Sequence, residues 1–244
     1  MDQDIMAWQR QLEEVGYVIV PGAFANDEVD ATLRQVESAI CQNQDGATLR
    51  AGAGSIYGAR NLLELWPPVK QVWRRSPLQQ LLRSILGPGF GLVRVLYFDK
   101  PPERTWSLPW HKDWTIAVRE NRLPSEHFSK PTVKAGVPHV EAPQALLENM
   151  VTLRIHLDDV TEENGPLLVL PRSHRLDSET KINTEPVAVL VKRGDVLLFR
   201  PLLDHYSRSS HEGTTRHRRL LHLEFAGWAT LPDGYAWHDF VAGR

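Results

Sequence analysis

Short apolar segments separated by turn residues fill the chain from Phe90 onward, and this pattern constrains the fold more than any other feature. The first segment, 90–98, is rich in strand-forming residues and ends at Lys100-Pro101-Pro102. Further segments of this kind lie at 150–159, 167–170, 187–191, 196–199 and 218–225. The segments 187–191 and 196–199 flank Arg193-Gly194-Asp195 and are predicted to pair as a hairpin. Many short strands with intervening turns are typical of a sandwich or barrel.

Helical patterns dominate the residues before this region. Apolar residues at helical spacing predict a helix over 4–15, and a compact apolar strand at 17–20 follows it. Asn26 is placed as the N-cap of a second helix that reaches about residue 40. A third helix is predicted from Pro77, at its first position, to the residue before Gly87.

Both halves together predict a mainly β protein: a double-stranded β-helix (jelly roll, cupin-like) with flanking N-terminal helices. A single domain is expected over residues 1–244, with helical support at about 1–88 and a jelly-roll core at about 90–230. Residues 42–60 are rich in Gly, Ala and Ser and are predicted to be a loop. The stretch 115–149 contains several prolines and little periodicity, and a long segment of this kind is often a lid.

Composition excludes several classes of function. A net charge of -2 over 244 residues, without a basic stripe, argues against a nucleic-acid binder. Cys41 is the only cysteine, so no intrachain disulfide can form and a reducing compartment is expected. No apolar run approaches the roughly 18 residues of a membrane span, and the acidic N-terminus lacks the apolar stretch of a secretory signal. We therefore expect a cytoplasmic protein whose partners are neither nucleic acid nor membrane.

The stretch 106–114 contains a candidate metal-binding pair, because His111 and Asp113 lie two residues apart in it. At a strand end, side chains at positions i and i+2 project from the same face. An imidazole and a carboxylate on one face supply two of the three ligands of a 2-His-1-carboxylate triad. That triad suits non-haem Fe(II), because it leaves coordination positions open. The third ligand would be a histidine from a distant part of the chain.

His205 is the best candidate for this third ligand. It follows the strand at 196–199 after a short turn that contains proline, so it is expected at a strand end, where distant strands of a closed barrel converge. His211, in a polar loop, is typical of an exposed residue. His222 lies in the middle of a strand and can face a cavity without binding metal, and His217 is a further alternative.

A second His-x-Asp pair, His156 and Asp158, weakens any inference from spacing alone. Such a pair arises by chance on the order of once in two chains of this size and histidine content. At least one of the two pairs is then a histidine beside a solvated carboxylate, and the spacing does not decide which one.

Ordered motifs are spread over most of residues 92–237. They are Phe98-Asp99-Lys100-Pro101-Pro102, Leu108-Pro109-Trp110-His111-Lys112-Asp113, Thr152-Leu153-Arg154-Ile155-His156-Leu157-Asp158-Asp159, Glu163-Asn164-Gly165-Pro166-Leu167, Leu170-Pro171-Arg172-Ser173-His174, Gly194-Asp195-Val196-Leu197-Leu198, His205-Tyr206-Ser207 and Arg218-Arg219-Leu220-Leu221-His222-Leu223-Glu224-Phe225. Together they resemble the phytanoyl-CoA dioxygenase-like family of Fe(II)/2-oxoglutarate oxygenases, especially its bacterial members. In that family the metal-binding pair lies in the tryptophan-flanked motif. The resemblance therefore implies that His111, Asp113 and His205 are the catalytic metal ligands, and that His156 and Asp158 are structural.

The resemblance also implies a set of contacts to 2-oxoglutarate. Arg218 matches the arginine that pairs with the distal carboxylate, a bidentate contact that guanidinium geometry favours. Ser207 matches a hydroxyl that helps to hold the same carboxylate, and Thr152 and Arg94 are also expected to face the cosubstrate. Arg216 is an alternative to Arg218, because the segment before Arg218 is about two residues longer than is usual in the family.

The implied activity is oxidation of a small molecule. Fe(II), the cosubstrate 2-oxoglutarate and O2 would be required, and hydroxylation of an aliphatic C–H would accompany decarboxylation of 2-oxoglutarate to succinate and CO2. Asp113 fills the position that related halogenases leave empty for chloride, so hydroxylation is expected. The alternatives are a jelly-roll metal enzyme that does not use 2-oxoglutarate, such as a hydrolase or isomerase, and a non-catalytic binding protein of the same fold.

Two features of the sequence bear on details of this site. Arg172 stands where the family usually has a glycine before Ser-His, so this turn is expected to be altered or to gain a positive charge. The lid segment carries basic residues and a histidine, namely Arg119, Arg122, Lys134 and His139. These residues either receive an anionic substrate or solvate the loop, which is the more common role.

Overall fold

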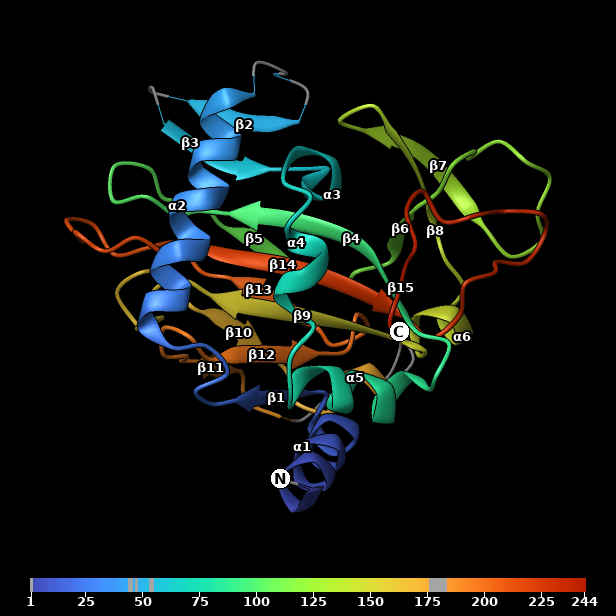
Figure 1. Ribbon diagram of the computed structural model, residues 1–244, viewed down its shortest axis with the longest axis horizontal. Helices are drawn as coiled ribbons and strands as arrows, with labels where there is room; N and C mark the ends of the chain where they lie inside the picture. Colours follow the sequence, from blue (N-terminus) through green and yellow to red (C-terminus); the bar gives the residue numbers. More distant parts are fainter. Residues whose placement is uncertain (1, 44–45, 47, 53–54, 176–183) are drawn as a thin grey trace.

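The computed structural model describes residues 2–43, 46, 48–52, 55–175 and 184–244. Its core consists of two β-sheets (Figure 1), and a cavity lies between them. Within the described residues the larger sheet has eight strands: β1 (Tyr17–Val20), β12 (Val196–Phe199), β9 (Met150–His156), β14 (Leu220–Ala226), β4 (Gly91–Phe98), β3 (Ser55–Ala59) and β2 (Leu49–Gly52) in this order, with β15 (Val241–Ala242) beside β4. The smaller sheet consists of β11 (Val187–Val189), β10 (Leu167–Val169), β13 (His205–Ser207) and β5 (Leu108–His111). This is the predicted jelly roll with flanking N-terminal helices.

Helices cover the outer face of the larger sheet, as Figure 1 shows. The long ones are α1 (Asp2–Val15), α2 (Asn26–Gln42) and α5 (Leu78–Leu86), and the short ones are α3 (Leu62–Leu65) and α4 (Val69–Val72). The short helix α6 (Gln144–Leu147) lies apart from them and packs in a separate apolar cluster. The caps differ by one position from the prediction. Ala25 is the N-cap of α2, because Glu28 reaches back to the Ala25 backbone N–H at 2.8 Å, and Pro77 is the cap of α5 rather than its first residue.

Strand β14 shows how the larger sheet separates core from cavity. Leu221, Leu223 and Phe225 belong to the apolar core beneath the helices, where Trp73 packs edge-on against Phe225 at 5.0 Å between ring centroids. Leu220, His222 and Glu224 alternate with them and line the cavity instead. Because both faces are covered, the strand is buried along nearly its whole length, and polar residues on its inner face stand out.

The predicted hairpin between residues 187–191 and 196–199 is wrong. Strand β11 pairs with β10 in the smaller sheet, whereas β12 pairs with β1 and β9 in the larger one. The chain crosses between the sheets at Gly194, whose φ is +85°. Asp195 fixes this crossing by accepting a hydrogen bond from the Gly22 backbone N–H at 2.7 Å. The same turn residues serve a crossover as well as a hairpin, so the local sequence does not distinguish the two.

The predicted loop at residues 42–60 is also wrong in its second half. Strands β2 and β3 pair with each other, and β3 extends the larger sheet through Gly58, which lies opposite Phe98 of β4. Residues 44–45, 47 and 53–54 of this prediction lie outside the described residues. Small side chains give little strand signal by themselves, but the free edge of β4 offers backbone hydrogen bonds that stabilise an added strand.

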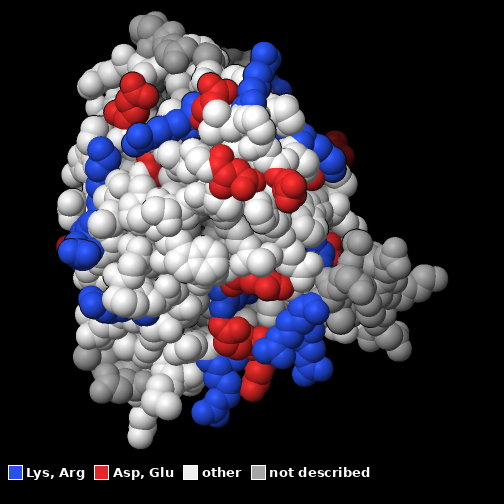
Figure 2. Space-filling view, turned by 90° about the vertical axis from the view of Figure 1, so that its right-hand side faces the viewer, with Lys and Arg blue, Asp and Glu red and all other residues white. Residues whose placement is uncertain are grey.

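The segment 115–149 is more regular than its sequence suggests. It forms a third sheet of β6 (Thr115–Ala117), β8 (Val137–Glu141) and β7 (Ser129–Lys134), with its own apolar cluster that includes Val118, Val140 and Trp237. Figure 2 looks onto this side of the molecule, where charges of both signs are interspersed. The role of the segment as a lid stays a prediction.

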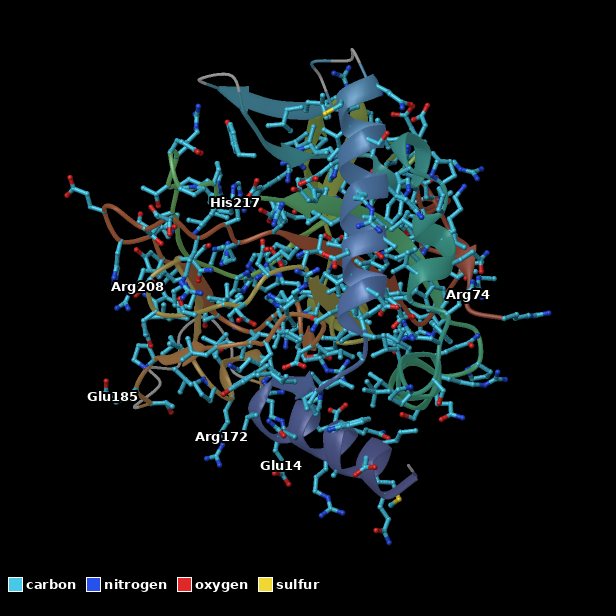
Figure 3. All side chains as sticks on the ribbon, turned by 60° about the vertical axis from the view of Figure 1, so that its left-hand side comes forward. Glu14, Arg74, Arg172, Glu185, Arg208 and His217 are labelled. Atoms are coloured by element: carbon cyan, nitrogen blue, oxygen red, sulfur yellow. The ribbon has the colours of Figure 1, made fainter. Side chains whose placement is uncertain are left out.

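Arg172 occupies a glycine-like turn. Its φ is +73°, in the left-handed region that glycine adopts without strain, and its backbone N–H donates to the Val15 carbonyl at 2.9 Å. The side chain is exposed and extends away from the fold beside α1 (Figure 3). Its charge therefore points to solvent rather than into the cavity.

Along the described chain, no helix has the length and apolar character required to cross a bilayer.

Candidate active site

His111, Asp113 and His205 converge where two strands of the smaller sheet meet. His111 ends β5, His205 begins β13, and the two residues lie directly opposite each other in the antiparallel register. The Asp113 backbone N–H donates to the Pro201 carbonyl at 2.8 Å, which holds the carboxylate beside both rings. Asp113 Oδ1 lies 3.8 Å from His111 Nε2, and Oδ2 lies 3.7 Å from His205 Nε2. All three ligand atoms lie within 4.8 Å of one another.

The backbone fixes the tautomer of both histidines. Nδ1 of His111 lies 2.6 Å from the Pro109 carbonyl, and Nδ1 of His205 lies 2.8 Å from the Leu203 carbonyl. A carbonyl only accepts, so each Nδ1 carries the proton and each Nε2 presents a lone pair. Burial lowers the pKa of His205 to about 4, although Asp113 acts in the opposite direction, so the ring is neutral at physiological pH.

This donor set fits a divalent metal ion. The Nε2 atom of His205 is buried and has no hydrogen-bond partner among the described residues, which is costly for a polar atom. Two imidazoles and one carboxylate, with space on the cavity side, match the facial triad of non-haem Fe(II).

The second His-x-Asp pair is built differently. His156 is buried on β9, and Asp158 accepts hydrogen bonds at 2.8 and 2.9 Å from the guanidinium of Arg219. Neither residue belongs to the His-Asp-His group. This pair is therefore not a surface histidine beside a solvated carboxylate.

The other candidate histidines are paired elsewhere or exposed. His217 lies 3.1 Å from Asp99, and His211 is exposed. His222 faces the cavity, accepts a hydrogen bond from Arg154 Nε on its Nδ1 at 3.1 Å, and has its Nε2 at 3.3 Å from Glu224. Both nitrogens of His222 are occupied in this way.

The cavity between the sheets has a volume of about 240 Å³ and is organised by three rows of residues across the larger sheet. In register these rows are Phe98–Leu220–His156, Leu96–His222–Arg154 and Arg94–Glu224–Thr152. The Phe199 ring lies 5.3 Å from the His205 ring and 6.3 Å from the His222 ring between centroids, so the His-Asp-His group lies beside the second row. We call the side beyond the first row the Arg218 end, and the third row with the adjoining residues the Arg94 end.

The Arg218 end concentrates buried donors. Arg218 is only 3% exposed, donates to the Gly165 carbonyl at 2.8 Å and lies 3.3 Å from the Ser207 hydroxyl. Lys100, which the sequence reasoning did not select, is fully buried and reaches the same hydroxyl at 3.0 Å. Arg216, the alternative to Arg218, is exposed and forms an ion pair with Glu163 at 3.2 Å.

Lys100, Arg154 and Arg218 are buried, and none of them forms an ion pair with a carboxylate among the described residues. Burial, reinforced by Arg218 and Arg154, lowers the pKa of Lys100 to about 6. Burial likewise lowers the pKa of Arg154 to about 10 and that of Arg218 to about 9. Uncompensated buried charge is destabilising, so these groups are suited to an anionic ligand.

Sequence reasoning missed Arg154 as well as Lys100. Arg154 lies between Thr152 and His156 on one face of an otherwise apolar strand, and this alternation of polar residues was a usable signal. Thr152 lies in the third row and does not line the cavity within the described residues. Arg94 lies in the same row and pairs with Glu224 at 3.1 Å. Neither residue is at the Arg218 end.

Comparison with known proteins agrees with this geometry. An ectoine dioxygenase of Bordetella parapertussis is 25% identical over 168 residues, which are 67% of this chain and 47% of that protein. The chain spans about half the length of the curated relatives it matches. EctD from S. alaskensis, crystallised with bound Fe, has a TM-score of 0.69 at 20% identity and covers 89% of this chain and 75% of its own. The epimerase SnoN from nogalamycin biosynthesis has a TM-score of 0.67 at 18% identity, over 96% of this chain and 88% of its own.

The two structures establish the jelly-roll fold, and the family is established by a match over most of the chain. The model of the phytanoyl-CoA dioxygenase (PhyH) family matches residues 12–218, which include His111, Asp113, His205 and Arg218. This chain belongs to the phytanoyl-CoA dioxygenase (PhyH) family.

Proposed function

We propose that this chain is an Fe(II)- and 2-oxoglutarate-dependent dioxygenase that hydroxylates an aliphatic C–H bond of a small molecule. The observation that carries the proposal is the convergence of His111, Asp113 and His205 at a cavity whose Arg218 end holds two buried basic side chains, Lys100 and Arg218, with no carboxylate partner among the described residues. The first group supports a metal ion, and the second supports a dicarboxylate beside it.

His111 and His205 would hold Fe(II) through Nε2, and Asp113 would hold it through a carboxylate oxygen. Their backbone contacts preset the tautomers, so no proton has to move when the metal binds. Bound Fe(II), together with 2-oxoglutarate and O2, supplies the oxidising chemistry. A protein carboxylate in the triad favours hydroxylation, because no position is left for a halide.

Arg218 and Ser207 would hold the distal carboxylate of 2-oxoglutarate, and Lys100, which donates to the Ser207 hydroxyl at 3.0 Å, would orient that hydroxyl. The Trp106 ring lies 4.4 Å from Lys100 Nζ and 5.7 Å from Arg218 Cζ, so it shields both groups from water. Shielding strengthens each charge-assisted hydrogen bond to the cosubstrate.

Relatives support the reaction class. The ectoine dioxygenase of Bordetella parapertussis shares 25% identity with this chain, and a similar L-proline trans-4-hydroxylase of Streptomyces griseoviridis shares 24%. SnoN, an epimerase, has the same fold, so hydroxylation is inferred from the ligand set and not from the fold. Cys41 as the only cysteine favours a reducing compartment, and we place the enzyme in the cytoplasm.

The test is 2-oxoglutarate turnover by purified protein supplied with Fe(II) and O2, measured as succinate formed. We expect slow succinate formation without substrate and none in Asp113→Ala, because the triad loses its carboxylate. Asp30→Asn is the matched control, since Asp30 is a carboxylate that pairs with Arg193 far from the cavity. If wild-type protein forms no succinate, or if Asp113→Ala retains full turnover, the proposal is wrong.

A further inference from the structure

The Arg94 end of the cavity carries more positive than negative charge. Arg60, Arg94 and Lys134 line it, and Glu224 is the carboxylate beside them. Glu224 already accepts from Arg94 at 3.1 Å and lies 3.3 Å from His222. Lys134 Nζ contacts Thr115 Oγ1 at 3.0 Å, a neutral hydroxyl, and no carboxylate pairs with it in the described part of the chain.

The net charge of the residues that line the whole cavity is also positive. Apart from Arg60, which has an interaction of its own, the lining includes four cationic side chains (Arg94, Lys134, Arg154 and Arg218) and two carboxylates (Asp113 and Glu224), which leaves an excess of two positive charges. Bound Fe(II) and the 2-oxoglutarate dianion would cancel each other, so the excess persists in the loaded enzyme. Positive charge in a low-dielectric cavity attracts and stabilises an anion.

The excess positive charge at the Arg94 end lies away from the place expected for 2-oxoglutarate. Leu220 and Glu224 lie in the first and third rows, about 13 Å apart along β14 at the usual rise per residue. Arg218 lies beyond the first row, and the His-Asp-His group lies beside the second, where His205 and His222 contact the same Phe199 ring. A ligand at the Arg94 end would therefore lie across the metal centre from the distal carboxylate of 2-oxoglutarate.

Two separate elements supply these donors. Lys134 is the last residue of β7 in the lid segment, whereas Arg94 belongs to β4 of the larger sheet. An anion bound between them would tie the lid segment to the sheet beside the metal centre. Burial and the neighbouring Arg94 and Arg60 lower the pKa of Lys134, and an anion would relieve this repulsion.

From these observations we infer that the substrate of the enzyme is an anion, whose carboxylate or phosphoryl group is bound by Lys134 and Arg94. The inference rests on the proposed function, because it places the substrate opposite a cosubstrate bound at Arg218. It selects Lys134 from the basic residues of the lid segment. Arg119 and Arg122 do not line the cavity among the described residues.

The experiment is calorimetry on oxygen-free protein loaded with Fe(II) and 2-oxoglutarate, with acetate, benzoate and phosphate as probes. Benzamide is the uncharged counterpart of benzoate. The visible charge-transfer band of the Fe(II)–2-oxoglutarate complex is recorded at each addition. We expect at least one anion to bind with the band retained, benzamide not to bind, and Lys134→Gln to weaken anion binding by about tenfold. Lys130→Gln is the control, because Lys130 lies on the same strand, is 73% exposed and pairs with Glu141 at 2.9 Å.

The outcomes distinguish failure of the proposed function from failure of the inference about the substrate. If no band forms in wild-type protein, the proposed function fails, whatever the anions do. If the band forms but no probe binds, benzamide binds as well as benzoate, or Lys134→Gln binds anions like wild type, the inference about the substrate is wrong. Loss of the band on adding an anion also counts against it, because the anion then displaces 2-oxoglutarate from the Arg218 end.

Discussion

Replacing Arg218 with lysine tests the cosubstrate site while keeping its charge. Arg218 is buried, and its guanidinium contacts the Gly165 carbonyl at 2.8 Å and the Ser207 hydroxyl at 3.3 Å, which fixes its orientation. A lysine keeps the positive charge but cannot make these contacts and also hold a carboxylate with two parallel hydrogen bonds. Arg218→Lys should therefore weaken 2-oxoglutarate binding without preventing Fe(II) binding.

The size of the effect follows from the lost contact. A hydrogen bond to a charged group contributes about 1.5–3 kcal/mol, so its loss raises the dissociation constant by roughly 10- to 150-fold. The assay is an anaerobic titration of Fe(II)-loaded protein with 2-oxoglutarate, followed by the visible charge-transfer band.

Arg216→Lys is the control in the same titration, because Arg216 is exposed and pairs with Glu163 at 3.2 Å. A surface ion pair contributes about 0–1 kcal/mol, so this variant should bind 2-oxoglutarate within roughly fivefold of wild type. If Arg216→Lys weakens binding and Arg218→Lys does not, the assignment of the two arginines is reversed and the cosubstrate site is misplaced.

Three further predictions concern Lys100, the turn at Gly165 and the turn at Arg172. Because burial lowers the pKa of Lys100 to about 6, 2-oxoglutarate should bind with proton uptake and more weakly as pH rises above that value. Calorimetry in two buffers measures the uptake, which Lys100→Met should remove. Gly165→Ala should lower the free energy of unfolding by about 1–3 kcal/mol in urea, because φ is +73° and the new Cβ would meet the Arg208 carbonyl. Gly136→Ala, also at positive φ but in open space, should cost less, and equal losses would contradict the steric explanation. Arg172→Gly should stabilise the protein by about 0.5–1 kcal/mol, since φ is +73° there, and a lower melting temperature would show that no strain was present.

Much of the jelly roll could be predicted from the sequence because its strands carry their own signals. Residues 17–20 and 90–98 correspond to β1 and β4 within a residue, since β-rich runs bounded by Pro and Gly are local features. Pairing is not local. The segments at 187–191 and 196–199 were predicted as partners but lie in different sheets, because a turn sequence does not specify which sheet the next strand joins.

For the site as well, local motifs could be predicted from the sequence and tertiary contacts could not. The motif that contains His111 and Asp113 is contiguous, and the structure brings His205 to it from more than ninety residues away, as the resemblance implied. Lys100 and Arg154 were missed, because a basic side chain is usually exposed and only the tertiary structure shows that these two are buried, with no carboxylate paired to them in the described part of the chain. Their contribution depends on neighbours such as Ser207 and Trp106, which come from other parts of the chain.

Anaerobic Fe(II) titration of the purified protein tests the metal centre most directly. Wild-type protein should bind one Fe(II), and 2-oxoglutarate should then produce the charge-transfer band. His111→Ala and His205→Ala should each lose tight Fe(II) binding and the band, whereas His211→Ala should behave as wild type, because His211 is exposed. Wild-type protein that binds no Fe(II), or triad variants that bind it as wild type does, would contradict the assignment of this site.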